Sequence, residues 1–175
     1  VTSLPQQTTK NQTSSQLIQN KYNTLNYSEQ NGVWVSYIEI SALLKNKSEA
    51  QFRTSLDTVF NNIKNLGCNT VYMHVRAYSD AYYQSGYFPW SKSCCGIIGE
   101  APEFAPLKVM IEEAHKKGIS FHAWINPLRG PSASDIAAYP DKFPIKQWYN
   151  NSAKKGKYIV AIKDYFYLNP AYPEV

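Results

Sequence analysis

The sequence predicts an α/β fold built on a parallel sheet, and two features of the chain carry this prediction. Segments rich in β-branched and aromatic residues alternate with segments whose apolar residues recur at helical spacing. Their order is strand, helix, strand, helix, strand, which requires right-handed crossovers between neighbouring parallel strands. The chain has 175 residues, of which 43% are hydrophobic, and this suffices for one core of ordinary size.

The first strand is predicted over residues 33–40 and the first helix over residues 48–66. The strand segment is β-branched and aromatic. The helix segment places its apolar residues on one face. Ser48 suits the N-cap, and Gly67 suits the position just past the helix end.

The later segments repeat this alternation once and then lose it. A second strand is predicted over 69–76, a second helix over 106–117 and a third strand over 119–125. Prolines then punctuate a long loop region after Asn126. Beyond it, helical turns are expected at 134–138 and 145–149, and a hairpin is expected from strands at 158–162 and 165–168. The start of a further helix is expected at 169–174.

The N-terminal segment differs sharply in composition from the remainder. Residues 1–30 are polar and poor in apolar side chains, so they are predicted to form a disordered leader or linker, and residues 31–175 a single domain. Tethers of this kind are typical of exported bacterial proteins, which predicts a secreted, cell-surface or periplasmic location. No apolar run approaches the ~20 residues of a membrane span.

Charge and cysteine content restrict the function classes. Lys and Arg number 18 and Asp and Glu 13, so the net charge is +5. The basic residues are scattered in short pairs, so a nucleic-acid partner is not expected. The chain has no C-x-x-C motif, and a disulfide from Cys68 to Cys94 or to Cys95 stays open.

Candidate binding residues follow the ends of the first two predicted strands, where function gathers in parallel barrels. Glu39 lies at the end of the first. In the second, His74 and Arg76 alternate with apolar residues and would point away from the helices. A long loop with many aromatic residues follows and contains Asp80 and Trp90. Aromatic faces stack on sugar rings, and Arg and Asp hydrogen-bond sugar hydroxyls.

The third predicted strand carries a second polar set. His122, Trp124 and Asn126 share one face, and Arg129 lies just beyond. Together they form a set suited to a polyol. His74 and His122 are expected at similar depth on adjacent strands, but a metal would need a third ligand. We therefore predict neither a metal nor another cofactor.

Several ordered motifs occur along the chain, namely Gly32–Val35, Asn65–Tyr72, Val75-Arg76, Asp80-Ala81, Tyr83, Phe88–Ser91, Pro106-Leu107, Met110–His115, Phe121–Pro127, Tyr167–Pro170 and Pro173–Val175. With these motifs the chain resembles the glycosyl hydrolase-like 10 family over about residues 32–175. The resemblance implies a TIM-barrel fold related to glycoside hydrolases, a glycan substrate with bacterial cell-wall glycan favoured, and export. By position it implies that Arg76, Asp80, Trp124, Asn126 and Arg129 line the cleft.

The predicted elements account for only part of such a barrel. A whole (β/α)8 barrel typically needs ~250 residues, whereas about three strands and two helices are predicted. The open face of the sheet would be covered by self-association or by a missing C-terminal half. The carboxylate pair of a glycosidase is expected beyond residue 175, so this chain alone should not hydrolyse peptide-free cell-wall glycan or a soluble β-glucan. A non-catalytic carbohydrate-binding module is the alternative.

Overall fold

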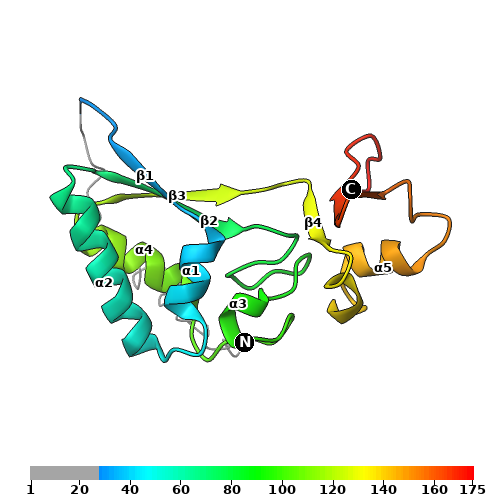
Figure 1. Ribbon diagram of the computed structural model, residues 1–175, viewed down its shortest axis with the longest axis horizontal. Coiled ribbons are helices and arrows are strands. Elements are labelled where there is room, and N and C mark those ends of the chain that lie inside the picture. Colours follow the sequence, from blue (N-terminus) through cyan, green and yellow to red (C-terminus); the bar gives the residue numbers. More distant parts are fainter. Residues whose placement is uncertain (1–27) are drawn as a thin grey trace, which may run out of the picture.

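The fold is a parallel sheet with helices on one side, followed by a smaller antiparallel sheet. The computed structural model describes residues 28–175, so most of the predicted leader lies outside the described residues. The strands β1 (Gly32–Val35), β2 (Thr70–Arg76) and β3 (Ser120–Ile125) pair in parallel in the order β1-β2-β3. The predicted α/β class and parallel sheet are therefore confirmed for this part of the chain (Figure 1).

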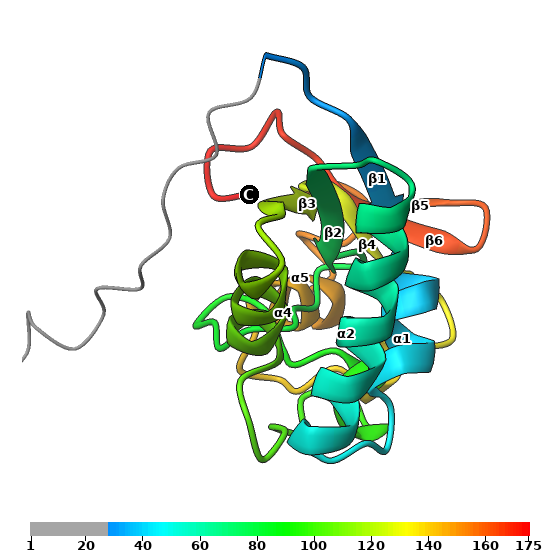
Figure 2. The same ribbon diagram turned by 90° about the vertical axis from the view of Figure 1, so that its left-hand side faces the viewer.

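Two helices cover one face of this sheet, α2 (Glu49–Asn65) and α4 (Pro106–Lys116), as Figure 2 shows. The alternation in β2 decides which face they cover, because Val71, Met73 and Val75 are fully buried in the same core as the apolar faces of both helices. The predicted direction of the apolar set is confirmed. The polar set of β2 consequently points to the opposite face.

The predicted strand over 33–40 is wrong in its second half. The strand ends at Val35, and a helix, α1 (Tyr37–Leu44), follows at once. Ser36 is its N-cap and Glu39 completes a capping box, which satisfies backbone N–H groups that a strand would pair with a neighbour. Ile40 and Leu44, one helical turn apart, are buried and outweigh the β-propensity of the segment.

The segment after β3 builds the second sheet. Its strands β4 (Arg129–Ser132), β5 (Ile159–Ile162) and β6 (Tyr165–Leu168) pair antiparallel in the order β4-β6-β5. The predicted hairpin is confirmed, and the predicted helical turns correspond to η1 (Ile136–Ala138) and α5 (Pro144–Asn150). A short helix in the loop after β2, α3 (Lys92–Cys95), was not expected. Residues 170–174 form turns and a bend where a helix start was predicted.

The face of β1–β3 opposite the helices is lined by aromatic rings and is open among the described residues. Trp34 is 62% exposed and stacks on Tyr72 with ring centroids 4.3 Å apart, and the Tyr72 ring lies 5.1 Å from that of His122. No helix within residues 28–175 is long and apolar enough to cross a membrane. The three cysteines are free thiols, so neither disulfide left open by the sequence is formed.

Candidate functional site

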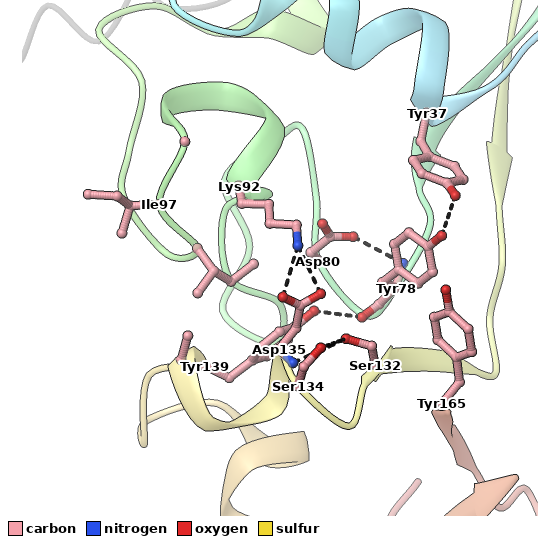
Figure 3. Close-up of a pocket in the computed structure, with 13 residues that line it drawn as sticks. Tyr37, Tyr78, Asp80, Lys92, Ile97, Ser132, Ser134, Asp135, Tyr139 and Tyr165 are labelled. Atoms are coloured by element: carbon pink, nitrogen blue, oxygen red, sulfur yellow. Dashed lines mark hydrogen bonds and ion pairs between the residues drawn. The ribbon is translucent and has the colours of Figure 1, made fainter. Parts of the chain in front are cut away.

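A pocket of about 620 Å³ lies where the chain leaves the carboxyl ends of the parallel strands. Its walls come from three parts of the chain: the start of α1 after β1, the loop after β2, and the β4–β6 region after β3. Figure 3 shows these side chains converging on one space. The lining residues are Tyr37, Tyr78, Asp80, Lys92, Gly96, Ile97, Ile98, Ser132, Ser134, Asp135, Ala138, Tyr139 and Tyr165.

Tyr78 connects three walls of this pocket. Its hydroxyl donates a hydrogen bond to the hydroxyl of Tyr37, and its carbonyl accepts one from the Tyr139 hydroxyl at 2.8 Å (Figure 3). Burial, together with the hydrogen bond to Tyr37, raises the pKa of Tyr78, so the phenol stays protonated across the physiological range. The pocket therefore presents neutral hydroxyl groups that can donate and accept hydrogen bonds.

Both acidic side chains in the pocket, Asp80 and Asp135, are engaged by neighbouring groups of the protein. Asp80 is 5% exposed and accepts the backbone N–H of Tyr78 at 3.0 Å. Burial raises the pKa of Asp80, although the hydroxyl of Ser91 opposes the shift. Both carboxylate oxygens of Asp135 accept hydrogen bonds from Lys92 Nζ, at 2.8 and 2.9 Å. Burial opposes ionisation of Asp135, but the hydrogen bonds from Lys92 and Ser132 keep its pKa below the ordinary value.

A ring wall continues from the pocket onto the sheet. The imidazole of His74 stacks on Trp124 with ring centroids 3.7 Å apart and planes inclined by 9°, and the Tyr37 ring lies 5.6 Å from it with the planes inclined by 73°. Trp124 Nε1 donates to Asn126 Oδ1 at 3.1 Å, which fixes the indole orientation. His74 is 2% exposed, and burial lowers its pKa to about 4, so the imidazole is neutral at pH 7.

Arg129 and Arg76 occupy neighbouring but different places. The Arg129 guanidinium lies 4.5 Å from the centre of the Tyr78 ring and 4.7 Å from that of Tyr165. Arg76 lies 4.3 Å from the centre of the Phe88 ring and lines a separate cavity of about 420 Å³. Arg76 and Asp80 therefore line different cavities, since Asp80 lines the pocket of about 620 Å³.

Three predicted binding residues lie elsewhere. Glu39 accepts the backbone N–H of Ser36 at 2.8 Å, and the Ser36 hydroxyl holds the pKa of this carboxyl below its usual value. Its oxygens therefore cap α1. Trp90 packs against the core and lines a cavity of about 820 Å³ beside α4. His122 is paired with Tyr72, whereas His74 is paired with Trp124. The two histidines therefore differ in depth, and the prediction of similar depth is wrong.

Several pocket residues were not found from the sequence. Tyr37 was assigned to a strand, although Ser36 and Glu39 form the capping-box pattern that predicts a helix start between them. Lys92, Asp135 and Tyr165 carry no local signal, because only the fold brings their segments together. Within residues 28–175, no group of three or more His, Cys, Asp or Glu side chains could hold a metal ion.

A parallel α/β sheet with a pocket at the carboxyl ends of its strands is typical of enzymes that bind small polar ligands at that edge. Residues 29–175 match the family described as glycosyl hydrolase-like 10, and the chain belongs to this family. The resemblance derived from its motifs is thereby confirmed.

Two curated proteins that are similar to this chain are named glycosyl hydrolases. One is "Glycosyl hydrolase YngK" of Bacillus subtilis, with 32% identity over 117 residues, which cover 66% of this chain and 22% of that protein. Another is "Glycosyl hydrolase DigH" of Escherichia coli, with 39% identity over 83 residues, which cover 47% of this chain and 19% of that protein. The matched part of the chain therefore spans about a fifth of the length of these relatives.

Proposed function

We propose that this chain forms the glycan-binding edge of a glycoside hydrolase that acts on a bacterial glycan, with cell-wall glycan as the favoured substrate. Family membership and the names of the two relatives support the hydrolase class. The observation that carries the proposal is the continuous wall of rings and hydroxyls at the strand ends, from Trp124 through Tyr37 and Tyr78.

The chemistry of this wall suits a sugar chain. Pyranose rings have apolar faces that stack on aromatic side chains, and their hydroxyls need both donors and acceptors. Trp124 offers a partly exposed ring, while Tyr37, Tyr78 and Ser132 offer hydroxyls around the pocket. The pocket volume of about 620 Å³ is ample for one or two sugar units.

The two pocket acids support a binding role better than a catalytic one. Glycoside hydrolysis normally needs one carboxyl to protonate the leaving oxygen and another to act as nucleophile or base. Asp80 is enclosed by its own loop, and Asp135 is paired with Lys92. We therefore propose that this chain binds glycan without cleaving it, and that residues outside 28–175 supply the catalytic carboxylates of the whole enzyme.

We further propose that β1–β3 belong to a (β/α)8 barrel. Parallel sheets are normally covered on both faces, yet Trp34 on the open face is 62% exposed. Further strand–helix units, or a second copy of the chain, would bury this face. The polar composition of residues 1–30 and the bacterial relatives support a secreted or cell-surface location as part of the same proposal.

A non-catalytic carbohydrate-binding module is the second candidate. The hydrogen bond to Asp80 and the ion pair of Asp135 favour it, because neither carboxylate is free to act in catalysis. The two candidates differ in whether the whole protein cleaves glycan. Turnover of peptide-free cell-wall glycan by the whole protein would establish the hydrolase. Binding without turnover would establish the module.

Replacing Trp124 with Ala should weaken binding of peptide-free cell-wall glycan to the 175-residue chain by about tenfold. The substitution removes the ring that stacks on His74 and that we propose contacts the sugar, an aromatic contribution of about 1.5 kcal/mol. Isothermal titration calorimetry would measure the change. Trp90→Phe is the control, because Trp90 lines the cavity beside α4 and is not among the residues that line the proposed glycan pocket. If only the control weakened binding, the glycan site would be misplaced.

A further inference from the structure

The three arginines of this chain have very different surroundings. Arg53 on α2 is held by three carboxylates, those of Glu49, Glu112 and Glu113, at 2.7, 2.8 and 2.6 Å. Arg76 and Arg129 have no carboxylate partner among residues 28–175. Two tyrosine rings face Arg129, but a single ring faces Arg76. The Nε atoms of Arg76 and Arg129 are both buried without a hydrogen-bond partner among the described residues, and Arg76 in addition lines a cavity.

The Arg76 side chain is 9% exposed, which makes its unpaired charge costly. Its Nη2 donates to the carbonyl of Asn126 at 3.3 Å, a long hydrogen bond. Its Nε is buried and has no hydrogen-bond partner among the described residues. The guanidinium thus retains donors that the fold does not use.

These donors belong to a side chain that lines a cavity of about 420 Å³ between the loop after β2 and the second sheet. Phe88 and Trp148 supply aromatic walls, and Leu128 and Ile145 supply apolar ones. One acid, Glu174, also lines the cavity, and its carboxylate accepts a hydrogen bond from Tyr158. A guanidinium with unused donors, set among rings and aliphatic groups, suits a ligand that combines a carboxylate with the apolar face of a ring.

We propose that the Arg76 cavity is a subsite for the carboxylate of an acidic sugar unit, so that the glycan bound by this chain is anionic. This inference rests on the proposed glycan-binding function and specifies its substrate class. The planar guanidinium fork can hold a carboxylate through two parallel hydrogen bonds. Hydrogen bonds to a charged group are also stronger than those to sugar hydroxyls.

Two forms of one glycan test the proposal. Peptide-free cell-wall glycan carries a carboxylate on each muramic acid unit, and chemical reduction converts these groups to alcohols without shortening the chain. The 175-residue chain should bind the carboxylate form at least about tenfold more tightly. Arg76→Met should bind both forms equally, because it keeps the aliphatic packing on Phe88 and removes the charge. Arg76→Lys should retain part of the preference.

The controls separate this proposal from the one on which it rests. Lys47→Gln removes one exposed positive charge between α1 and α2 and should leave the preference unchanged. Equal binding of both glycan forms by the unaltered chain would overturn the acidic subsite and leave the glycan-binding function standing. Binding of neither form would overturn that function itself. Thermal melts check folding. Arg76→Met should melt no lower than the unaltered chain, because the substitution removes a buried charge that has no carboxylate partner among the described residues. If it unfolded, Arg76→Lys would carry the test.

Discussion

Replacing His74 with Phe is expected to remove most of the acid sensitivity of this fold between pH 6.5 and pH 4. Burial, reinforced by the charge of Arg129, lowers the pKa of His74 from 6.5 to about 4 in the folded chain. In this window the unfolded chain binds a proton at His74 and the folded chain does not. Folding stability therefore rises with pH through the window and is lost as the pH falls, by up to about 3 kcal/mol.

The packing explains why Phe is the informative replacement. The imidazole stacks on Trp124 and contacts the Tyr37 ring at a steep angle, and neither of its nitrogens makes a well-formed hydrogen bond with a described residue. A phenyl ring keeps the aromatic contacts and cannot be protonated. The stability of His74→Phe at pH 7 should therefore stay close to that of the unaltered chain or exceed it.

Urea unfolding at pH 7, 5.5 and 4.5 would measure this effect. The unaltered chain should lose stability steeply over the series, and His74→Phe should lose much less. His122→Phe is the matched control, because His122 is exposed on the open face of the sheet and this substitution should leave the loss in place. Equal acid sensitivity in His74→Phe and the unaltered chain would show that carboxylates dominate the pH dependence.

The parts of the fold that the sequence predicted are those with a strong periodic pattern. The helix at 48–66 and the strand at 69–76 have long apolar periods with clear boundaries, and both lie within one residue of the prediction. The segment 33–40 failed because β-branched residues at Ile38 and Ile40 favour a strand locally. The cap at Ser36 and the burial of Ile40 and Leu44 decide for a helix.

The candidate site was predicted less well than the fold, for a physical reason. Residues on β2 and β3 could be assigned to one face from alternation alone, which located His74 and Trp124. The pocket is completed by Tyr37, Asp135 and Tyr165, which come from distant segments. The approach of Asp135 and Tyr165 depends on the pairing of β4 with β6, and β4 contains Gly130 and Pro131, which are not typical of strands.

Gly130 lies where β4 and β6 approach each other closely. A Cβ atom on this residue would lie 2.9 Å from the carbonyl oxygen of Phe166 and 3.1 Å from Ile145 Cδ1. Because the first contact is backbone, β4 and β6 would have to separate. Gly130→Ala should therefore lower the free energy of unfolding by about 1 to 3 kcal/mol. Urea unfolding would measure this loss.

The same substitution should also weaken glycan binding, and more than the loss of stability alone explains. Gly130 follows Arg129, and β6 carries Tyr165, so separating the strands moves the guanidinium away from one of the two rings that face it. Binding should be measured well below the melting temperature, where Gly130→Ala is still folded. Gly86→Ala is the matched control, since no atom lies within 4 Å of a Cβ at Gly86. Unchanged binding by folded Gly130→Ala would show that the glycan does not depend on the alignment of Arg129 with Tyr165. Reduced glycan binding by Gly130→Ala, with unchanged binding by Gly86→Ala, would place the second sheet within the sugar-binding surface.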